Sequence, residues 1–351
     1  MGIFTALLIL SFLIFFHELG HFSAARLFGV QVDVFSIGFG KKLFTKQIGK
    51  TQWTISMIPL GGYVKMKGQD DSDPSFVSYD EDSYNVKKPW QRIIILLAGP
   101  FANFLLAFLL YLSISFIGVP KLLATVGDIN TTQPAYKAGL QIGDKIVQIN
   151  GKKILYWEEI GESIQKSSFD LQVTVLRENK YIDLRITPKL QKIKNNFNES
   201  IERKIIGIQP DMNSSTIVQY NINKGLDYAY TQTKNASMLI VKGLQKLISG
   251  LVPVDQLGGV VSIVDVTAKA SSVGLTALLF FTALISVNLG VLNLLPIPAL
   301  DGGHIMFNLY EMITKRKPNE DIMYKLTLMG WAILLSVMLL GLYNDMNRLL
   351  G

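Results

Sequence analysis

The sequence predicts a polytopic α-helical membrane protein with four transmembrane helices, a membrane-associated β-hairpin region and an inserted extracytoplasmic β-rich domain. Apolar residues make up 49% of the chain and charged residues only 17%, whereas soluble proteins average about 25% charged residues. The mean hydropathy is positive, at +0.31. The apolar residues gather in four runs, each long enough to span ~30 Å of hydrocarbon as a helix. The segments between these runs contain strand-like alternation of apolar and polar residues.

The four apolar runs also predict an orientation in the membrane. They cover residues 3–26, 92–118, 275–297 and 326–343. The first run has no basic residues before it and no small-residue cleavage site, which favours a span over a cleaved signal peptide. Of the shorter segments, 27–91 and 300–325 are the ones rich in Lys and Arg, and the positive-inside rule places them in the cytoplasm. The long segment 119–274 is also basic, but loops of that length translocate regardless of charge. We therefore expect a multi-pass protein of the inner (plasma) membrane, with both termini and 119–274 outside.

The overall charge and the cysteine content exclude some functions. The formal net charge is +7, which could indicate a nucleic-acid partner. No nucleic-acid module is recognisable, however, and membrane proteins commonly gain positive charge from their inner loops, so we expect no nucleic-acid partner. The chain has no cysteine, which excludes disulfides and thiolate metal ligands.

Residues 17–21, HELGH, place two histidines and a glutamate inside the first apolar run. On a helix, His17 and His21 lie one turn apart on one face and can hold a single metal ion, while Glu18 lies beside that ion and suits a general base. The alternatives are a chance motif or two histidines packed in a core. Ionisable groups inside a span are costly and usually functional, which favours a catalytic zinc site.

A catalytic zinc ion needs a third protein ligand and an open position for water. Asp301 in NLLPIPALDGGH, after the third apolar run, is the candidate, although it could instead cap a helix. At about 1.5 Å per residue, His17 lies in the cytoplasmic half of its span, and the third run delivers Asp301 to the same side. We interpret His304 as structural, because three ligands already leave the open position that hydrolysis requires.

Five motifs follow one another along the chain: HELGH, IPLGGYVKM, LAGPFANFLLAF, ISVNLGVLNLLPIPALDGGH and GLYNDMNRL. Together they resemble the site-2 protease family, and within it the branch of the bacterial regulator of sigma-E protease (RseP), over nearly the whole chain. The resemblance implies an intramembrane zinc metalloprotease that cuts transmembrane segments near the cytoplasmic face. It also implies that His17, His21 and Asp301 bind Zn²⁺ and that Glu18 is the catalytic base.

The resemblance further implies substrate-binding residues. Asn288 and Asn293 match asparagines that the family places near the scissile segment, although interhelical hydrogen bonds are an alternative role. In 27–91, VDVFSIGFGKKLF and TQWTISMIPLGGYVKM alternate as strands do. The family uses such strands to offer an edge to the substrate, which assigns Gly61 and Gly62 to substrate binding; plain cytoplasmic hairpins are the alternative. The acidic residues 69–85 predict a mobile linker.

The outer segment contains TTQPAYKAGLQIGDKIVQINGKKI, which is similar to PDZ domains of bacterial proteases. We expect a PDZ core at 122–190 and a linker at 191–204. Such domains bind chain ends or extended peptides, so substrate ends are the expected partner. Only one PDZ domain fits, whereas the best-known relatives carry two. Residues 205–274 predict amphipathic helices on the outer membrane surface.

These predictions divide the chain into four parts: an N-terminal membrane core (1–118), the PDZ domain with its linker (119–204), an amphipathic segment (205–274) and a C-terminal membrane core (275–351). By resemblance, the expected substrates are transmembrane proteins or peptides such as trimmed anti-sigma factors or remnant signal peptides. A metal transporter is a rival interpretation, but we find none of the internal repeats that transporters show. The second rival interpretation is an inactive relative that only binds peptides, and the presence of Glu18 argues against it.

Overall fold

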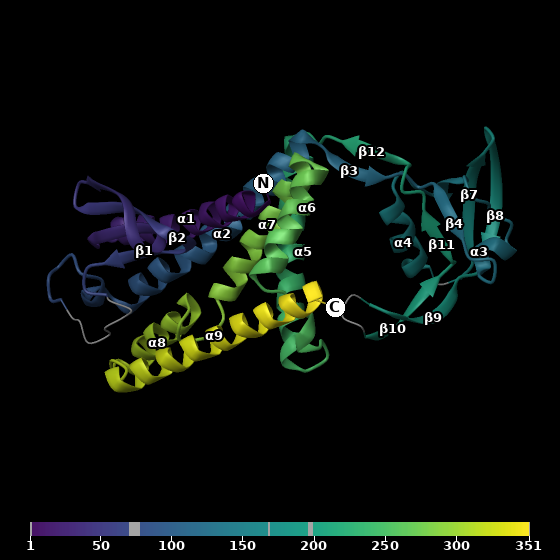
Figure 1. Ribbon diagram of the computed structural model, residues 1–351. Helices are drawn as coiled ribbons and strands as arrows, with labels where there is room; N and C mark the ends of the chain where they lie inside the picture. The colour runs from purple at the N-terminus through teal and green to yellow at the C-terminus, as the bar shows by residue number, and fades with distance from the viewer. Residues whose placement is uncertain (1, 70–77, 168, 196–198, 351) are drawn as a thin grey trace. The chain divides into compact units, whose positions relative to one another are not determined.

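The computed structural model describes residues 2–69, 78–167, 169–195 and 199–350. The chain forms two compact units (Figure 1). The first, called the helical unit below, comprises Met1–Ile114, Asn223–Leu247 and Pro253–Gly351. The second, called the strand-rich unit, comprises Ser115–Ile222 and Ile248–Val252. Each unit has its own core, so each is described by itself.

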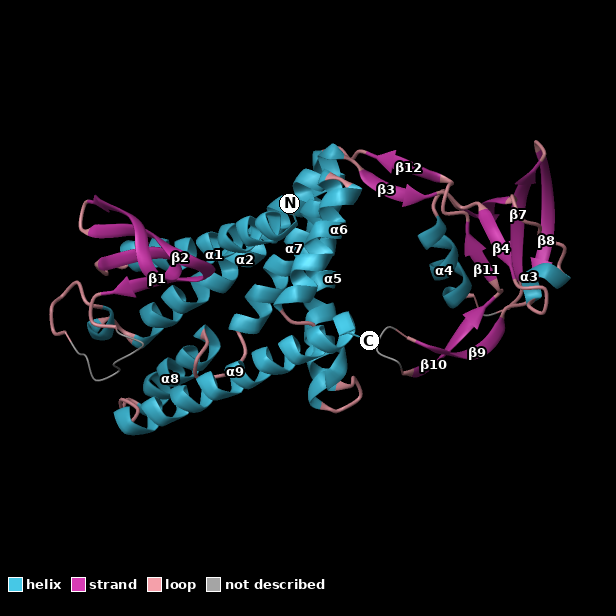
Figure 2. Cartoon of the chain, in the orientation of Figure 1, coloured by secondary structure: helices cyan, strands magenta, loops and turns pink. Residues whose placement is uncertain are grey.

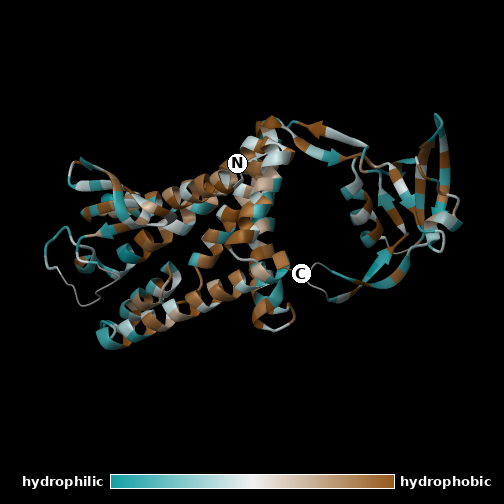
Figure 3. Ribbon diagram, in the orientation of Figure 1, coloured by the Kyte–Doolittle hydropathy of each residue, from teal (hydrophilic) through white to brown (hydrophobic). Residues whose placement is uncertain are grey.

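Four helices are long and apolar enough to cross a membrane, as predicted: α1 (Gly2–Leu27), α2 (Pro89–Ile117), α7 (Leu275–Asn293) and α9 (Glu320–Leu350). Apolar residues run along all of them (Figure 3). Large side chains such as Phe4, Leu335 and Met338 are exposed in the protein alone, as expected for surfaces that face lipid. The four helices support an integral membrane protein. Helix α7 ends before the expected residue 297, because prolines follow in LLPIP and cannot donate helical hydrogen bonds.

The other helices described in the helical unit are α5 (Ile222–Ile248), α6 (Val260–Val273), α8 (Asp301–Thr314) and the short 3₁₀ helices η1 (Tyr84–Val86) and η2 (Val254–Gln256). Helix α6 packs against α1, α7 and α9. Its start is capped from α9, since the buried Asp345 carboxylate accepts hydrogen bonds from the backbone N–H groups of Gly259 and Ser262, each at 3.0 Å. Residues 260–273 thus pack against three other helices of the helical unit.

Two long strands, β1 (Val32–Ile48) and β2 (Thr51–Met66), form the antiparallel sheet predicted in 27–91. Both strands bend, so that Ile37 pairs with Ile55 on one side and with Gly62 on the other. The first half of β1 therefore lies between the two halves of β2. Within the described residues, Gly62 and its neighbour Tyr63 pair with β1 alone, which leaves this stretch as an edge of the sheet.

The strand-rich unit is built around a four-stranded antiparallel sheet in the order β6-β5-β7-β8 (Figure 2). The pairs β4 with β11 and β3 with β12 and two short helices also belong to it. The elements are β3 (Val119–Leu122), β4 (Val126–Ile129), α3 (Pro134–Lys137), β5 (Lys145–Ile149), β6 (Lys152–Lys153), α4 (Trp157–Lys166), β7 (Leu171–Arg177), β8 (Lys180–Ile186), β11 (Ile208–Pro210) and β12 (Ser215–Val218). Fully buried residues such as Ile146, Ile160 and Val173 form its core.

The structure differs from the expected linker at 191–204. Strands β9 (Lys189–Lys194) and β10 (Ser200–Ile205) pair as an antiparallel hairpin. Most side chains on both strands are exposed. The sequence of this hairpin therefore lacks the alternation of apolar and polar residues that would predict its strands. The unit also extends past the expected core at 122–190 and past residue 205, since β11 and β12 belong to it.

Part of the predicted acidic linker at 69–85, namely 70–77, lies outside the described residues. The residues that follow are held by ion pairs. The Lys67 ammonium lies 2.8 Å from an Asp80 carboxylate oxygen and 2.7 Å from one of Asp82. These two carboxylates raise the pKa of Lys67 above its usual range. The end of the segment is therefore tied to the end of β2.

Candidate metal centre

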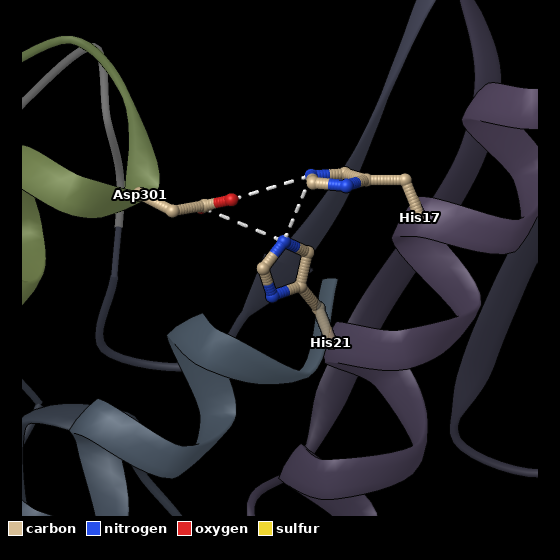
Figure 4. Close-up of side chains that lie close together, drawn as sticks. All are labelled: His17, His21 and Asp301. Atoms are coloured by element: carbon tan, nitrogen blue, oxygen red, sulfur yellow. Dashed lines mark hydrogen bonds and ion pairs between the residues drawn. The ribbon is translucent and has the colours of Figure 1, made fainter. Parts of the chain in front are cut away.

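Three predicted ligands converge in the helical unit (Figure 4). The Nε2 atoms of His17 and His21 lie 3.2 Å apart. Asp301 Oδ2 lies 3.3 Å from His17 Nε2, and Asp301 Oδ1 lies 3.5 Å from His21 Nε2. One ligand atom from each residue falls within 4.8 Å of the others, which is close enough for all three to coordinate one ion.

The two histidines lie one turn apart on α1, and α2 packs closely against them. His21 is 6% exposed, and its Nδ1 lies 2.9 Å from the backbone carbonyl oxygen of Ile95. A carbonyl only accepts, so Nδ1 carries the proton and Nε2 keeps a free lone pair for a metal. A Cβ atom at Gly99 would lie 2.2 Å from His21 Nε2. Glycine at this position therefore lets α2 approach the centre.

The chain around Asp301 is folded tightly at the start of α8. A Cβ at Gly302 would lie 2.3 Å from the Leu295 carbonyl oxygen, and one at Gly303 would lie equally close to that of Ile297. The two glycines thus let the LLPIP segment turn back against the first turn of α8. Asp301 is the first residue of that helix, so its carboxylate projects from the turn toward α1.

Helix α8 is also anchored to α2. Arg92 Nη2 donates a hydrogen bond of 2.7 Å to Glu311 Oε2, and both side chains are largely buried, at 12% and 16% exposure. This ion pair joins the helix that covers the histidines to the helix that carries the aspartate. It therefore helps to hold the third ligand in place.

The donor set fits zinc. Two neutral imidazoles and a carboxylate are the ligand types of catalytic zinc sites, which leave one position open. Asp301 Oδ2 is buried and makes no hydrogen bond within the described residues, although it lies near His17. A buried carboxylate oxygen without a donor is costly, and a metal ion would satisfy it.

A cavity of about 580 Å³ opens beside the three ligands. Its wall includes His17, Asp301 and Glu18. The cavity is large enough for a short stretch of peptide, since ligand pockets commonly range from about 300 to 1,000 Å³. A Cβ at Gly62 would lie 3.3 Å from Glu18 Cγ, so the edge of the sheet lies directly against the expected catalytic base.

Of the other site residues predicted from the sequence, some line this cavity and others do not. Gly61, Gly62 and Asn293 line the cavity, and Asn293 Nδ2 lies 3.5 Å from His17 Nε2. Asn288, on the same helix, is half-buried and is not among the lining residues described. His304 lies on α8 with its ring 6.0 Å from that of Phe307, and it does not join the described cluster of ligands.

Sequence reasoning missed Asn103. This residue of α2 is fully buried, lines the cavity and has its Nδ2 atom 3.1 Å from His17 Nδ1. A signal was present, because Asn103 is an isolated amide in an apolar span and such residues are usually functional.

Comparison with known proteins agrees with this centre. The profile of peptidase family M50 matches residues 5–337. The chain belongs to peptidase family M50. It is 48% identical over 347 residues to a Campylobacter jejuni protein described as a candidate zinc metalloprotease, covering 99% of this chain and 94% of that protein. A protein of Helicobacter pylori strain J99 with the same kind of description is 43% identical, with 99% of each chain covered. The regulator of sigma-W protease RasP of Bacillus subtilis is 29% identical, with 98% of this chain and 97% of RasP covered.

The M50 family is the family of site-2 proteases, so the sequence resemblance is confirmed at the level of the family. The protein is a zinc metalloprotease of the site-2 type, and zinc is its cofactor. The four apolar helices agree with an integral membrane protease.

Proposed function

We propose that this M50 protease hydrolyses peptide bonds within transmembrane segments of membrane proteins. One observation carries the proposal: His17 and His21 come from an apolar helix long enough to span a membrane, and Asp301 follows a second such helix. A protease for soluble substrates has no need to place its ligands in such surroundings, where ionisable groups are expensive.

In the proposed mechanism His17, His21 and Asp301 would hold the zinc ion. When bound, zinc supplies a Lewis acid that makes water more acidic and polarises a carbonyl. Glu18 accepts the proton of the attacking water and then delivers it to the nitrogen of the leaving amine. The bond between the carbonyl carbon and that nitrogen then breaks, and Glu18 returns to its deprotonated form. Glu18 suits this role because it lines the cavity between His17 and the edge of the sheet.

The edge at Gly61 and Gly62 is the proposed substrate-binding element. The amides of a substrate helix are already hydrogen-bonded to one another, so the helix must open before a protease can attack it. An extended segment could then pair with the free edge of β2, as in other cases of strand addition. Asn293 is better placed than Asn288 to contact such a segment, because Asn293 lines the cavity beside His17.

The strand-rich unit is proposed to be a PDZ domain that binds substrate ends. A cavity of about 460 Å³ lies between α4 and the segment that contains β10 and β11. Its wall combines apolar residues, Trp157 and Ile160, with the basic residues Arg203 and Lys204. An apolar groove with positive charge suits a peptide that ends in a carboxylate.

The cellular setting is part of the same proposal. The distribution of Lys and Arg supports a plasma-membrane protein of the RseP branch, with both termini and the strand-rich unit outside and the metal centre toward the cytoplasm. The proposed substrates are trimmed anti-sigma factors or remnant signal peptides. The name of the B. subtilis relative, a regulator of sigma-W protease, supports a regulatory substrate.

The proposal is tested by mapping the cleavage site. The purified protein is reconstituted into liposomes with a model substrate that has one transmembrane helix and soluble flanks, and the products are identified by mass spectrometry. We expect a cut inside the apolar segment that is absent with Glu18→Gln. Cleavage confined to the soluble flanks would refute the intramembrane function.

A further inference from the structure

Asn103 is a fully buried amide on the apolar helix α2. Its side chain faces the metal centre, with Nδ2 3.1 Å from His17 Nδ1. Its backbone is held separately, because the Ser286 hydroxyl on α7 donates a 2.8 Å hydrogen bond to the Asn103 carbonyl oxygen. The position of Asn103 is thus set by helix packing, and its amide is directed at one of the proposed zinc ligands.

The tautomer of His17 determines which atom of that amide must face it. His17 Nε2 points to His21 Nε2 and to Asp301, at 3.2 and 3.3 Å, so Nε2 is the nitrogen that can bind the metal. A neutral imidazole carries one proton, which must then lie on Nδ1. An Nδ1–H group inside an apolar span needs a hydrogen-bond acceptor.

The carboxamide of Asn103 can supply this acceptor. With Nδ2 facing His17 Nδ1, two donors meet, and Asn103 Oδ1 is left buried without a partner in the described part of the chain. Rotation of the amide by half a turn exchanges the nearly isosteric oxygen and nitrogen. Oδ1 then accepts the proton of Nδ1, which removes both the clash of donors and the unpaired oxygen.

His21 shows the same arrangement with a different acceptor. Its Nδ1 donates to the Ile95 carbonyl oxygen at 2.9 Å. Ile95 and Asn103 lie about two turns apart on α2, which puts them on the same face of that helix. One face of α2 therefore meets the Nδ1 atoms of both histidines.

We propose that Asn103 is a positioning residue for zinc: its Oδ1 accepts the hydrogen bond from His17 Nδ1–H and so presents the Nε2 lone pair to the metal. This inference rests on the proposed role of His17 as a ligand. Partners that orient ligating histidines in this way typically contribute 10- to 100-fold to metal affinity.

The test measures the zinc affinity of the full-length protein in detergent, by competition with a chelator. Asn103→Leu keeps a similar volume without an acceptor and should bind zinc about 10- to 100-fold more weakly. Asn103→Asp keeps an acceptor oxygen and should restore the affinity to within a few-fold of the original protein. Thr282→Ala is the matched control, because Thr282 is a buried polar residue of α7 whose hydroxyl donates to the Leu278 carbonyl oxygen of its own helix; its affinity should not change.

A second measurement uses the original protein and does not depend on the folding of a variant. The chain has only three histidines, so the ¹⁵N NMR signals of the zinc-loaded protein can be assigned with single substitutions. We expect His17 to carry its proton on Nδ1. A proton on Nε2 would overturn the inference, as would unchanged affinity in Asn103→Leu or equal losses in Asn103→Leu and Asn103→Asp. If His17→Ala itself bound zinc normally, the proposed ligand set would fail as well.

Discussion

Replacing Gly99 by alanine should disrupt the metal centre without removing any ligand. The new Cβ would lie 2.2 Å from His21 Nε2 and 2.9 Å from His17 Cε1, whereas non-bonded carbon contacts are usually about 3.5 Å or longer. Either α2 or the His21 ring must therefore move by about 1.3 Å. Zinc ligands tolerate deviations of only about 0.2 Å. We expect zinc affinity to fall by at least about 10-fold and cleavage to fall by about 10²-fold.

The assay combines chelator competition with cleavage of a labelled transmembrane substrate by the full-length protein, and circular dichroism monitors folding. Gly290→Ala is the matched control. Gly290 also lies in a predicted spanning helix, but its added Cβ would meet the Phe104 ring at 3.1 Å and the Pro100 carbonyl oxygen at 3.3 Å, and neither residue is a proposed ligand. If folded Gly99→Ala bound zinc as tightly as the control, the close approach of α2 would have no role in the metal centre.

Three further predictions address the neighbourhood of the centre. Gly62→Ala places a Cβ 2.8 Å from Ile14 and 3.3 Å from Glu18 Cγ. Cleavage should therefore fall while the zinc content is unchanged. Loss of zinc from this variant would contradict the assignment of Gly62 to substrate binding. Glu311→Gln removes the charged partner of Arg92 and should lower stability to thermal unfolding by about 1–3 kcal/mol, and an unchanged melting temperature would show that the pair is not structural. Val119 and Val218, the first and last residues of segment 119–218, pair with each other between β3 and β12 and lie about 5 Å apart. A short Gly-Ser linker can therefore replace the whole segment. Cleavage of a short transmembrane substrate should survive this deletion, because all proposed zinc ligands lie in the helical unit; its loss in a folded, zinc-loaded variant would assign the strand-rich unit to the chemistry.

The metal centre could be predicted from the sequence because its parts follow local rules. The spacing of His17 and His21 is one helical turn, and the apolar surroundings made their charge costly enough to indicate a function. Asp301 required a long-range argument from the expected depth of His17 and of the segment after the third apolar run. The structure places Asp301 at the start of α8, beside both histidines. The strands of 27–91 were likewise predictable from their alternation, including the glycines that now line the cavity.

Other features depend on packing that no local pattern encodes. Asn103 meets His17 only because small residues let α2 pack against α1; a Cβ at Gly20, for example, would lie 2.2 Å from the Ala98 carbonyl oxygen. Helix α6 packs between other helices through similarly small residues, since a Cβ at Gly2 would lie 2.5 Å from that of Ala268. The β9–β10 hairpin is exposed on both faces, so burial imposes no alternation on its sequence.

The most direct test of the account compares Glu18→Gln with His21→Ala in zinc content and in cleavage. Gln keeps the size of Glu18 and can still form hydrogen bonds, but it cannot accept a proton. We predict that Glu18→Gln retains about one zinc ion per chain while cleavage falls by about 10²-fold or more, and that His21→Ala loses both zinc and cleavage. Undiminished zinc in His21→Ala, or cleavage by Glu18→Gln at the original rate, would contradict the roles assigned to these residues.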